Sequence, residues 1–334
     1  MNDRRVHFHV FCSVKGGVGK STLAVAMAKL LAARGRVPVL IDVDLTGSSL
    51  ADGLALCAPK MTECVDGSMD LDAPPTGAFL SHAETVNKRH ARKLWMLEEP
   101  PAPPYLNDAL LYQVRVPHRD CRVDAMLWSH ERPDGVLYLP SSPLRKDVED
   151  SSMLLHGNEH FKWVRRAAWV LEALLSLRKD ITDVVLDMPP GMVGFTHQII
   201  GYLDMLAAGE ALTEDFPDLT VPGILASVQI FLLTTPDWNA LLPTLEDVAS
   251  AAMYYPALHL RPIVNRTNFT ALSDIQRALR QRELDPALRD LGLEEKLEAV
   301  DEGSTLGEIF RRRDLVMTSK EAARLENILL KEER

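Results

Sequence analysis

The sequence has few cysteines, no long uncharged apolar run and no excess of basic residues. Four cysteines in 334 residues are too few for a disulfide framework. No apolar run is long enough to cross a bilayer, and the first strand-like run begins too close to Met1 to leave room for a secretory leader. The net charge of -10 argues against a broadly basic nucleic-acid surface, although DNA binding through a local patch stays open. We expect a cytoplasmic protein without a membrane segment.

A glycine-rich segment near the N-terminus, residues 13–22, is the strongest motif. It lies between an alternating apolar run typical of a strand and a helical repeat. A loop placed before a helix directs several backbone N–H groups at one phosphate chain. Lys20 would reach the β- and γ-phosphates, and the Ser21 hydroxyl would bind Mg²⁺. The residues expected to bind the nucleotide here are Gly16, Gly17, Val18, Gly19, Lys20, Ser21 and Thr22.

Apolar strand-like runs alternate with amphipathic helical repeats along most of the chain. This alternation predicts a parallel sheet covered by helices on both faces. The pattern weakens between residues 51 and 134, where prolines and histidines accumulate. That stretch is too long for an ordinary strand–helix connection. We interpret residues 51–134 as an insertion or partly ordered lid within one domain spanning residues 1–334, with a short helix expected over residues 84–97.

Three aspartates follow buried strand-like runs and are candidates for the chemistry. Asp42 and Asp44 end the run at residues 37–43, and Asp187 ends the run at residues 183–187. The carboxyl ends of parallel strands form the ligand-binding edge of such a sheet. Asp187 is therefore predicted to hold Mg²⁺ together with Ser21, and Asp42 and Asp44 place further negative charge at the same edge. For each aspartate, capping of a following helix is the alternative interpretation.

Two segments resemble a known family. Residues 15–21, Lys-Gly-Gly-Val-Gly-Lys-Ser, are similar to the deviant Walker A motif of the MinD/ParA family of P-loop ATPases. Residues 184–191, Val-Val-Leu-Asp-Met-Pro-Pro-Gly, resemble the Walker B and switch II segment of the same family, including its Mrp-like members. The resemblance implies a three-layer α/β P-loop NTPase fold with a mostly parallel central sheet and a long insertion after the second strand. It also implies an ATPase that uses ATP and Mg²⁺.

The resemblance further implies roles for individual residues. Lys15 would cross a nucleotide-sandwich homodimer to the phosphates of the other subunit. Asp44 would orient the attacking water, and Asp42 would belong to the ligand shell of Mg²⁺. Gly191 would lie close to the γ-phosphate. Asn265, followed by Arg266, would contact adenine, and the guanine-specific Asn-Lys-x-Asp string is absent. A solvated loop lysine and a turn asparagine remain the alternatives for Lys15 and Asn265.

These observations favour an ATP-hydrolysing molecular switch that dimerises with ATP and recruits or positions an unidentified protein partner or cargo. An ATP-dependent carrier or synthetase is one alternative, and it would require an acceptor pocket or paired cysteines. A nucleotide-holding interaction module with little turnover is the other. Zinc binding by Cys57 with Cys64, or by His118 with Cys121, is disfavoured because the spacings are not paired C-x₂-C units.

Overall fold

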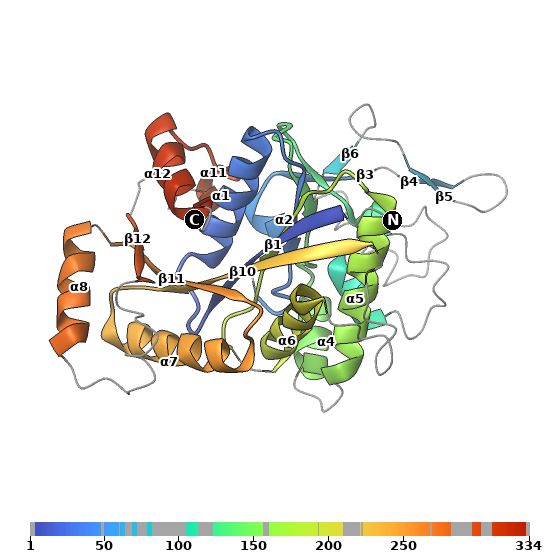
Figure 1. Cartoon of the computed structure of the whole chain (residues 1–334). Coiled ribbons are helices and arrows are strands. Elements are labelled where there is room, and N and C mark those ends of the chain that lie inside the picture. Colours follow the sequence, from blue (N-terminus) through green and yellow to red (C-terminus); the bar gives the residue numbers. More distant parts are fainter. Residues whose placement is uncertain are drawn as a thin grey trace.

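A seven-stranded sheet forms the centre of the protein in the computed structural model (Figure 1). The strand order is β12-β11-β10-β1-β9-β2-β8, and every pairing within the sheet is parallel. The strands are β1 (Arg4–Ser13), β2 (Pro38–Asp42), β8 (Leu137–Leu139), β9 (Asp183–Asp187), β10 (Ile224–Thr234), β11 (His259–Asn265) and β12 (Glu298–Val300). The structure describes residues 4–47, 50–59, 61–63, 69–71, 79–81, 105–112, 123–155, 160–192, 194–209, 221, 223–267, 269–281, 296–301 and 309–331.

The strand sequences explain why the sheet is buried on both faces. All five residues of β2 and all five of β9 are buried, as expected for short apolar runs in a parallel sheet. Successive side chains alternate between two cores: Val10 and Cys12 pack into one, and Phe11 packs into the other. Phe11 stacks on Phe231 of the neighbouring strand β10 with ring centroids 4.8 Å apart. Such an aromatic pair contributes about 0.5–1.5 kcal/mol beyond its buried area.

Helices cover both faces, which gives three layers (Figure 1). One core receives side chains from α5, α6, α7 and α8, and the other from α1, α2, α11 and α12. This arrangement confirms the predicted α/β fold class. The helices are α1 (Lys20–Ala33), α2 (Leu50–Gly53), α4 (Arg145–Leu155), α5 (His160–Leu177), α6 (Phe195–Ala208), α7 (Trp238–Tyr254), α8 (Phe269–Gln281), α11 (Ile309–Arg312) and α12 (Ser319–Leu329).

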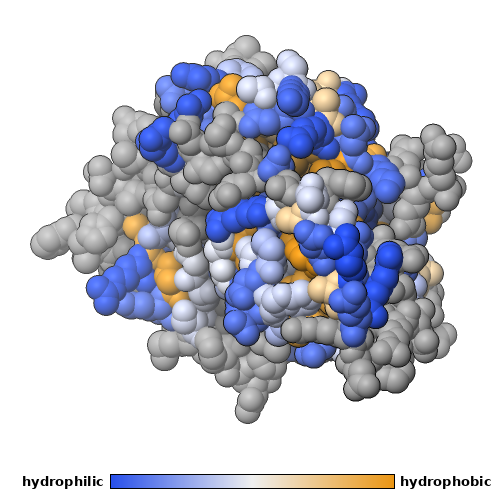
Figure 2. Space-filling view, turned by 90° about the vertical axis from the view of Figure 1, so that its left-hand side faces the viewer, coloured by the Kyte–Doolittle hydropathy of each residue, from blue (hydrophilic) through white to orange (hydrophobic). Residues whose placement is uncertain are grey.

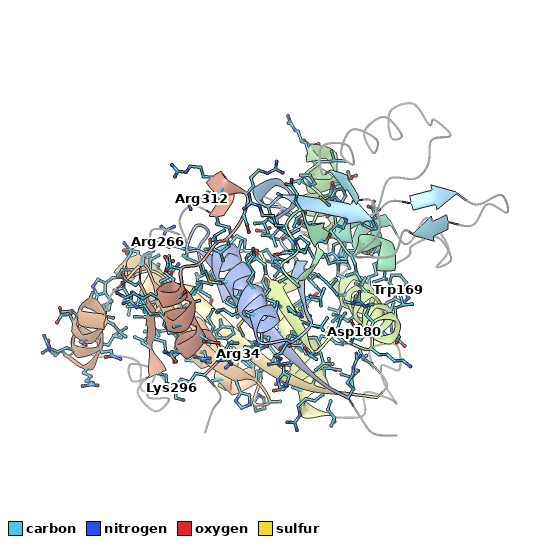
Figure 3. The ribbon with its side chains drawn as sticks, turned by 90° about the horizontal axis from the view of Figure 1, so that it is seen from above. Arg34, Trp169, Asp180, Arg266, Lys296 and Arg312 are labelled. Atoms are coloured by element: carbon cyan, nitrogen blue, oxygen red, sulfur yellow. The ribbon has the colours of Figure 1, made fainter. Side chains whose placement is uncertain are left out.

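The C-terminal helix α12 lies beside α1 (Figures 1 and 3). Its start is fixed by a capping box, in which Thr318 and Glu321 each bond the backbone N–H of the other. Arg34, just after α1, pairs with Glu326 of α12 at 2.6 Å. The last helix is therefore packed against the domain, on the same face of the sheet as α1, the helix that follows the glycine-rich loop.

The predicted insertion, residues 51–134, builds small antiparallel sheets apart from the central one. Its described ends reach the core, since Tyr105 and Trp128 are fully buried with rings 5.1 Å apart. Trp128 also exchanges two backbone hydrogen bonds with Tyr138 of β8. The helix predicted over residues 84–97 lies outside the described residues. The elements are β3 (Leu56–Pro59), β4 (Met61–Glu63), β5 (Met69–Leu71), β6 (Phe79–Ser81), β7 (Ser129–His130), the π-helix η1 (Asp108–Tyr112) and the 3₁₀ helix η2 (Val123–Met126).

Among the described residues on the face shown in Figure 2, hydrophilic ones predominate and hydrophobic ones form small spots between them. Among the described residues, no helix combines the length and the apolar character that a membrane span requires.

Candidate functional site

The carboxyl ends of β1, β9 and β2 meet at one edge of the sheet. Phe11 of β1 is paired in register with Asp187 of β9, and Asp187 is paired with Asp42 of β2. The glycine-rich loop leaves β1 two residues after Phe11, at Ser13. The register therefore brings the loop and both predicted Mg²⁺ ligands to one place, although the two aspartates are far apart in sequence.

Two glycines of the glycine-rich loop have left-handed backbone angles. Gly17 and Gly19 have φ angles of 75° and 95°, which side-chain-bearing residues rarely adopt. A Cβ atom added at Gly16 or Gly17 would meet nothing within 4 Å, whereas one at Gly19 would lie 2.3 Å from Asn265 Nδ2. Gly19 is thus required for close packing inside the protein. Gly16 and Gly17 instead line open space, which leaves room for a ligand against the loop.

Lys20, the first residue of α1, is only 7% exposed. Its charge acts on the Asp187 carboxyl, which is 2% exposed. Burial raises the pKa of Asp187 to about 6, against the opposing effects of the Lys20 ammonium and of a hydrogen bond from Ser21. Three predicted site residues, Lys20, Ser21 and Asp187, are therefore brought together.

Asp42 is buried next to Asp187, and its negatively charged form is likewise disfavoured there. Burial and the negative charge of Asp187 raise the pKa of Asp42 to about 8. Its Oδ2 atom accepts hydrogen bonds from the Leu50 N–H at 2.8 Å and from the Ser141 hydroxyl at 2.7 Å. The predicted helix-cap alternative is thus also realised, because Leu50 begins α2.

The site fits a hard divalent cation. The Oδ1 atoms of Asp42 and Asp187 are buried, and neither has a hydrogen-bond partner in the part of the chain that the structure describes. Two such carboxylates and the Ser21 hydroxyl form an oxygen donor set of the kind that Mg²⁺ binds. No group of three His, Cys, Asp or Glu side chains in the described ranges is arranged to hold a metal ion. Phosphate oxygens and water would have to complete the coordination, as is usual for Mg²⁺ bound with a nucleotide.

The raised pKa of Asp42 predicts how stability depends on pH without Mg²⁺. The folded protein holds a proton on Asp42 up to about pH 8, whereas the unfolded chain releases it near its ordinary value of 3.8. The free energy of unfolding should therefore fall as pH rises between these values. Asp42→Asn removes the contribution of Asp42 to this pH dependence. The melting temperature of Asp42→Asn minus that of wild type should therefore be at least about 3 °C larger at pH 8 than at pH 5. Differential scanning calorimetry with EDTA checks this, with the exposed Asp274→Asn as control; parallel curves for wild type and Asp42→Asn would contradict it.

Asp44 is half-buried and closes a turn. Its Oδ1 atom accepts hydrogen bonds from the backbone N–H groups of Thr46, at 3.3 Å, and Gly47, at 2.8 Å. A Cβ atom at Gly47 would lie 2.4 Å from Asp44 Oδ2, so the turn closes tightly on the carboxylate. The Asp44 charge also contributes to the raised pKa values of Asp42 and Asp187, which places it near both.

Gly191 and Lys15 border the loop. The Gly191 N–H donates to the carbonyl of Ser13 at 2.7 Å, and Gly191 has a φ angle of 96°. The segment after β9 is thereby held against the start of the glycine-rich loop. Lys15 is exposed, and its Nζ atom lies 3.9 Å from Oδ2 of Asp237, the N-cap of α7. Such an exposed pair is weak and can be broken at little cost.

Asn265 ties the loop to β11. Its Nδ2 atom donates to the buried Val18 carbonyl at 2.7 Å, and its Oδ1 atom accepts from the Arg266 N–H at 2.9 Å. Arg266 is exposed and has a φ angle of 58°. Both polar atoms of the Asn265 amide are thus engaged within the protein, and contact with adenine stays a prediction. Thr22 lies half-buried in the first turn of α1.

Sequence reasoning missed three contacts: the Ser141–Asp42 hydrogen bond, the Asn265–Val18 hydrogen bond and the Lys15–Asp237 pair. Their positions in the sequence could have indicated Ser141 and Asp237, because both residues follow strands that end at the same edge of the sheet.

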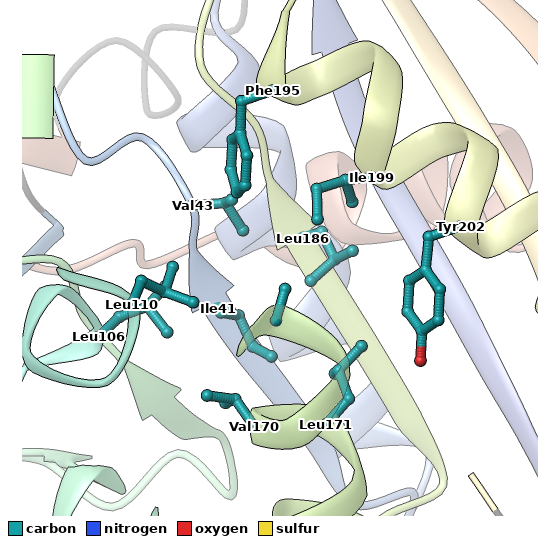
Figure 4. Close-up of a pocket in the computed structure, with 11 residues that line it drawn as sticks. Ile41, Val43, Leu106, Leu110, Val170, Leu171, Leu186, Phe195, Ile199 and Tyr202 are labelled. Carbon is teal, nitrogen blue, oxygen red and sulfur yellow. The ribbon is translucent and has the colours of Figure 1, made fainter. Parts of the chain in front are cut away.

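An apolar cavity of about 30 Å³ lies behind the aspartates, between the sheet and helices α5 and α6 (Figure 4). Ile41 and Leu186, which precede Asp42 and Asp187, line it together with Phe195 and Tyr202 of α6. Its apolar lining is unsuited to phosphate.

The comparisons with known proteins agree with this geometry. Residues 9–278 match the family model described as the CobQ/CobB/MinD/ParA nucleotide binding domain. A cytosolic Fe-S cluster assembly factor Nubp2 homolog from Drosophila virilis is 34% identical over 97 residues, which are 28% of this chain and 36% of the relative. The Danio rerio nubp2 factor is 34% identical over 73 residues, 22% of this chain and 27% of the relative. These matches span about a third or less of the relatives' length.

Solved structures share the fold over nearly the whole chain. The cell division ATPase MinD of Pyrococcus furiosus has a TM-score of 0.52 at 16% identity and covers 97% of both chains. A plasmid partition protein from Borrelia burgdorferi has a TM-score of 0.51 at 14% identity, covering 98% of this chain and 97% of its own. The septum site-determining protein MinD from Pyrococcus horikoshii, complexed with Mg-ADP, has a TM-score of 0.50 at 15% identity. The match covers 97% of this chain and 94% of the MinD chain.

Proposed function

Because the chain belongs to the CobQ/CobB/MinD/ParA nucleotide binding family, we propose that it binds ATP with Mg²⁺, hydrolyses it to ADP and phosphate, and works as a dimeric molecular switch. One observation carries the proposal. The charge of a buried lysine at the start of α1 acts on buried Asp187, which is paired in register with buried Asp42. The Oδ1 atoms of both aspartates lack partners among the described residues, and the glycine loop that precedes the lysine is open to solvent. In this arrangement the lysine and the loop N–H groups offset the negative charge of a triphosphate, and the aspartates offset the positive charge of a divalent cation.

Each residue at the loop has a definite task. Lys20 neutralises the β- and γ-phosphates, and the backbone N–H groups of residues 16–22 hold the phosphate chain. Ser21, Asp42 and Asp187 hold Mg²⁺, which neutralises charge on the phosphate oxygens. Asp44 orients the attacking water and accepts its proton on the side away from the leaving ADP. Gly191, held against the loop by its hydrogen bond to Ser13, is the residue close enough to sense whether the γ-phosphate is present.

Lys15 makes the reaction depend on a dimer. Its side chain is exposed at the loop and forms a weak pair with Asp237. Released from this pair, it reaches the phosphates bound to a second copy of the chain and stabilises charge in the transition state. ATP then joins two subunits and hydrolysis separates them, so a surface formed by the dimer recruits or positions a partner only in the ATP state.

A second candidate function is an ATP-dependent carrier or synthetase. The observation that favours it is the 34% identity over 97 residues to the Nubp2 homolog, a cytosolic Fe-S cluster assembly factor. The cysteines among the described residues are buried Cys12 and half-buried Cys57. They do not supply a paired-cysteine motif, so we rank this function below the switch.

Turnover without any added acceptor tests the proposal. Wild type should hydrolyse ATP with a rate per molecule that rises with protein concentration, because the dimer is the active species. Lys15→Ala should lower this rate about 100-fold or more, while the exposed Lys179→Ala leaves it unchanged. Phosphate release measured at several protein concentrations gives both results. Equal rates for Lys15→Ala and wild type would overturn the role of Lys15. Turnover only with an added substrate would indicate a synthetase, and negligible turnover a nucleotide-holding module.

A further inference from the structure

The buried polar side chains next to Asp42 are the part of the site that the proposed function does not yet use. Five of them are at most 1% exposed, and we call them the serine–asparagine cluster: Asn107, Ser141, Ser142, Asp147 and Ser151. Burying a polar group without hydrogen bonds is costly, so a cluster of this size has a structural or functional reason.

Strand register brings the cluster to Asp42. β8 pairs with β2 so that Leu139 is opposite Ile41, and Asp42 therefore lies beside the chain that leaves β8. Ser141, 99 residues away in sequence, donates its hydroxyl to Asp42 Oδ2 at 2.7 Å. The Leu50 N–H fills the other position on the same oxygen. With Oδ2 occupied twice, Oδ1 is the oxygen left for a ligand, so Ser141 helps to decide how the carboxylate is presented.

The position of Ser141 is set by its neighbour Ser142. The Ser142 N–H donates to Asn107 Oδ1 at 2.6 Å, and the Ser142 hydroxyl donates to Asp147 Oδ2 at 2.6 Å. Asn107 is held in turn, because its Nδ2 atom donates to Ser151 Oγ at 3.0 Å. The chain at residues 141–142 is therefore clamped from two sides by buried hydrogen bonds.

One side of this clamp belongs to the predicted insertion. Asn107 directly precedes η1, and the Leu106 N–H donates to the Pro140 carbonyl at 3.0 Å. Residues 106–107 thus bond the backbone on both sides of Ser141. The described end of the insertion is consequently part of the support of Asp42.

We propose that Ser141 is a positioning residue that orients Asp42 toward Mg²⁺, and that Asn107 of the insertion holds Ser141 in place. The inference rests on the proposed function, because it concerns the same Mg²⁺ site. It gives the insertion a definite role: a change at residues 106–107 would alter how Asp42 presents its free oxygen, and with it the affinity for Mg²⁺.

The test measures Mg²⁺-dependent binding of a fluorescent, non-hydrolysable ATP analogue by the full chain, independently of turnover. Ser141→Ala should raise the Mg²⁺ concentration for half-maximal binding about tenfold, since a hydrogen bond to a charged group is lost. Binding of the analogue in EDTA should stay unchanged. Ser141→Thr should restore the wild-type value within about twofold, and Asn107→Ala should shift it about threefold in the same direction as Ser141→Ala.

A matched control separates positioning from stability. Thr244→Val in α7 removes another buried hydroxyl, one that donates to the Ala240 carbonyl at 2.8 Å, and it should leave the Mg²⁺ requirement unchanged. If Ser141→Ala does not fold, Ser141→Cys takes its place, because a thiol is a much weaker donor of similar volume. An unchanged Mg²⁺ requirement in these Ser141 variants, with wild type binding normally, overturns the inference alone. Failure of wild type to bind the analogue with Mg²⁺ overturns the proposed function and the inference together.

Discussion

Lys20→Ala is expected to weaken ATP binding about 100-fold or more and to abolish measurable turnover. Lys20 is buried at the start of α1, where its ammonium opposes the rise in the pKa of Asp187. Two effects therefore combine. The phosphates lose a charge-assisted partner, a loss of about 1.5–3 kcal/mol per hydrogen bond. In addition, the pKa of Asp187 rises further without the lysine, so the carboxyl is more often protonated and holds Mg²⁺ less well.

Isothermal titration calorimetry with a non-hydrolysable ATP analogue and Mg²⁺ measures the first effect. Lys15→Ala is the matched control, because it removes an exposed lysine of the same loop, one whose side chain forms a weak pair with Asp237. In dilute protein, where dimers are rare, the affinity of Lys15→Ala should stay within about threefold of wild type. An affinity of Lys20→Ala equal to that of the control would remove the phosphate-binding assignment of the loop.

The parts of the site that could be predicted from sequence depend on local rules. The glycine-rich loop connects two adjacent elements, and its positive φ angles at Gly17 and Gly19 follow from residue type. Asp187 was placed by its position at the end of a short buried strand. In each case the residues that decide the structure lie within one element or one connection between adjacent elements.

The missed contacts depend on strand order and register. Ser141 meets Asp42 only because β8 is the neighbour of β2, and Asn265 reaches the Val18 carbonyl from β11, two strands away from β1. Alternation of strands and helices predicts a parallel sheet but leaves the order of its strands open. The insertion was recognised by the weakening of periodicity. Its support of Asp42 through Asn107 could not be recognised, because a single buried asparagine in an irregular segment does not belong to any helical or strand repeat.

Asp44→Ala is expected to lower ATP turnover at least about 100-fold, the usual contribution of a general base, and to leave the ATP-bound dimer in place. The physical reason is that the phosphates and Mg²⁺ are held by other residues, so assembly persists while the attacking water loses its acceptor. Light scattering with ATP should show a dimer that outlasts that of wild type. A monomer under these conditions would contradict the sandwich arrangement.

The structure supplies a competing explanation for such a loss, since Asp44 also closes the turn at Thr46 and Gly47. Asp44→Asn separates the two roles, because an asparagine side-chain oxygen accepts the same backbone hydrogen bonds but carries no charge to take up a proton. If the turn alone matters, Asp44→Asn should recover turnover to near wild type. If the carboxylate is the acceptor, Asp44→Asn should be as slow as Asp44→Ala, yet melt several degrees higher than it because the turn is intact. We expect the second outcome, since the Asp44 charge acts on both Asp42 and Asp187 at the proposed Mg²⁺ site.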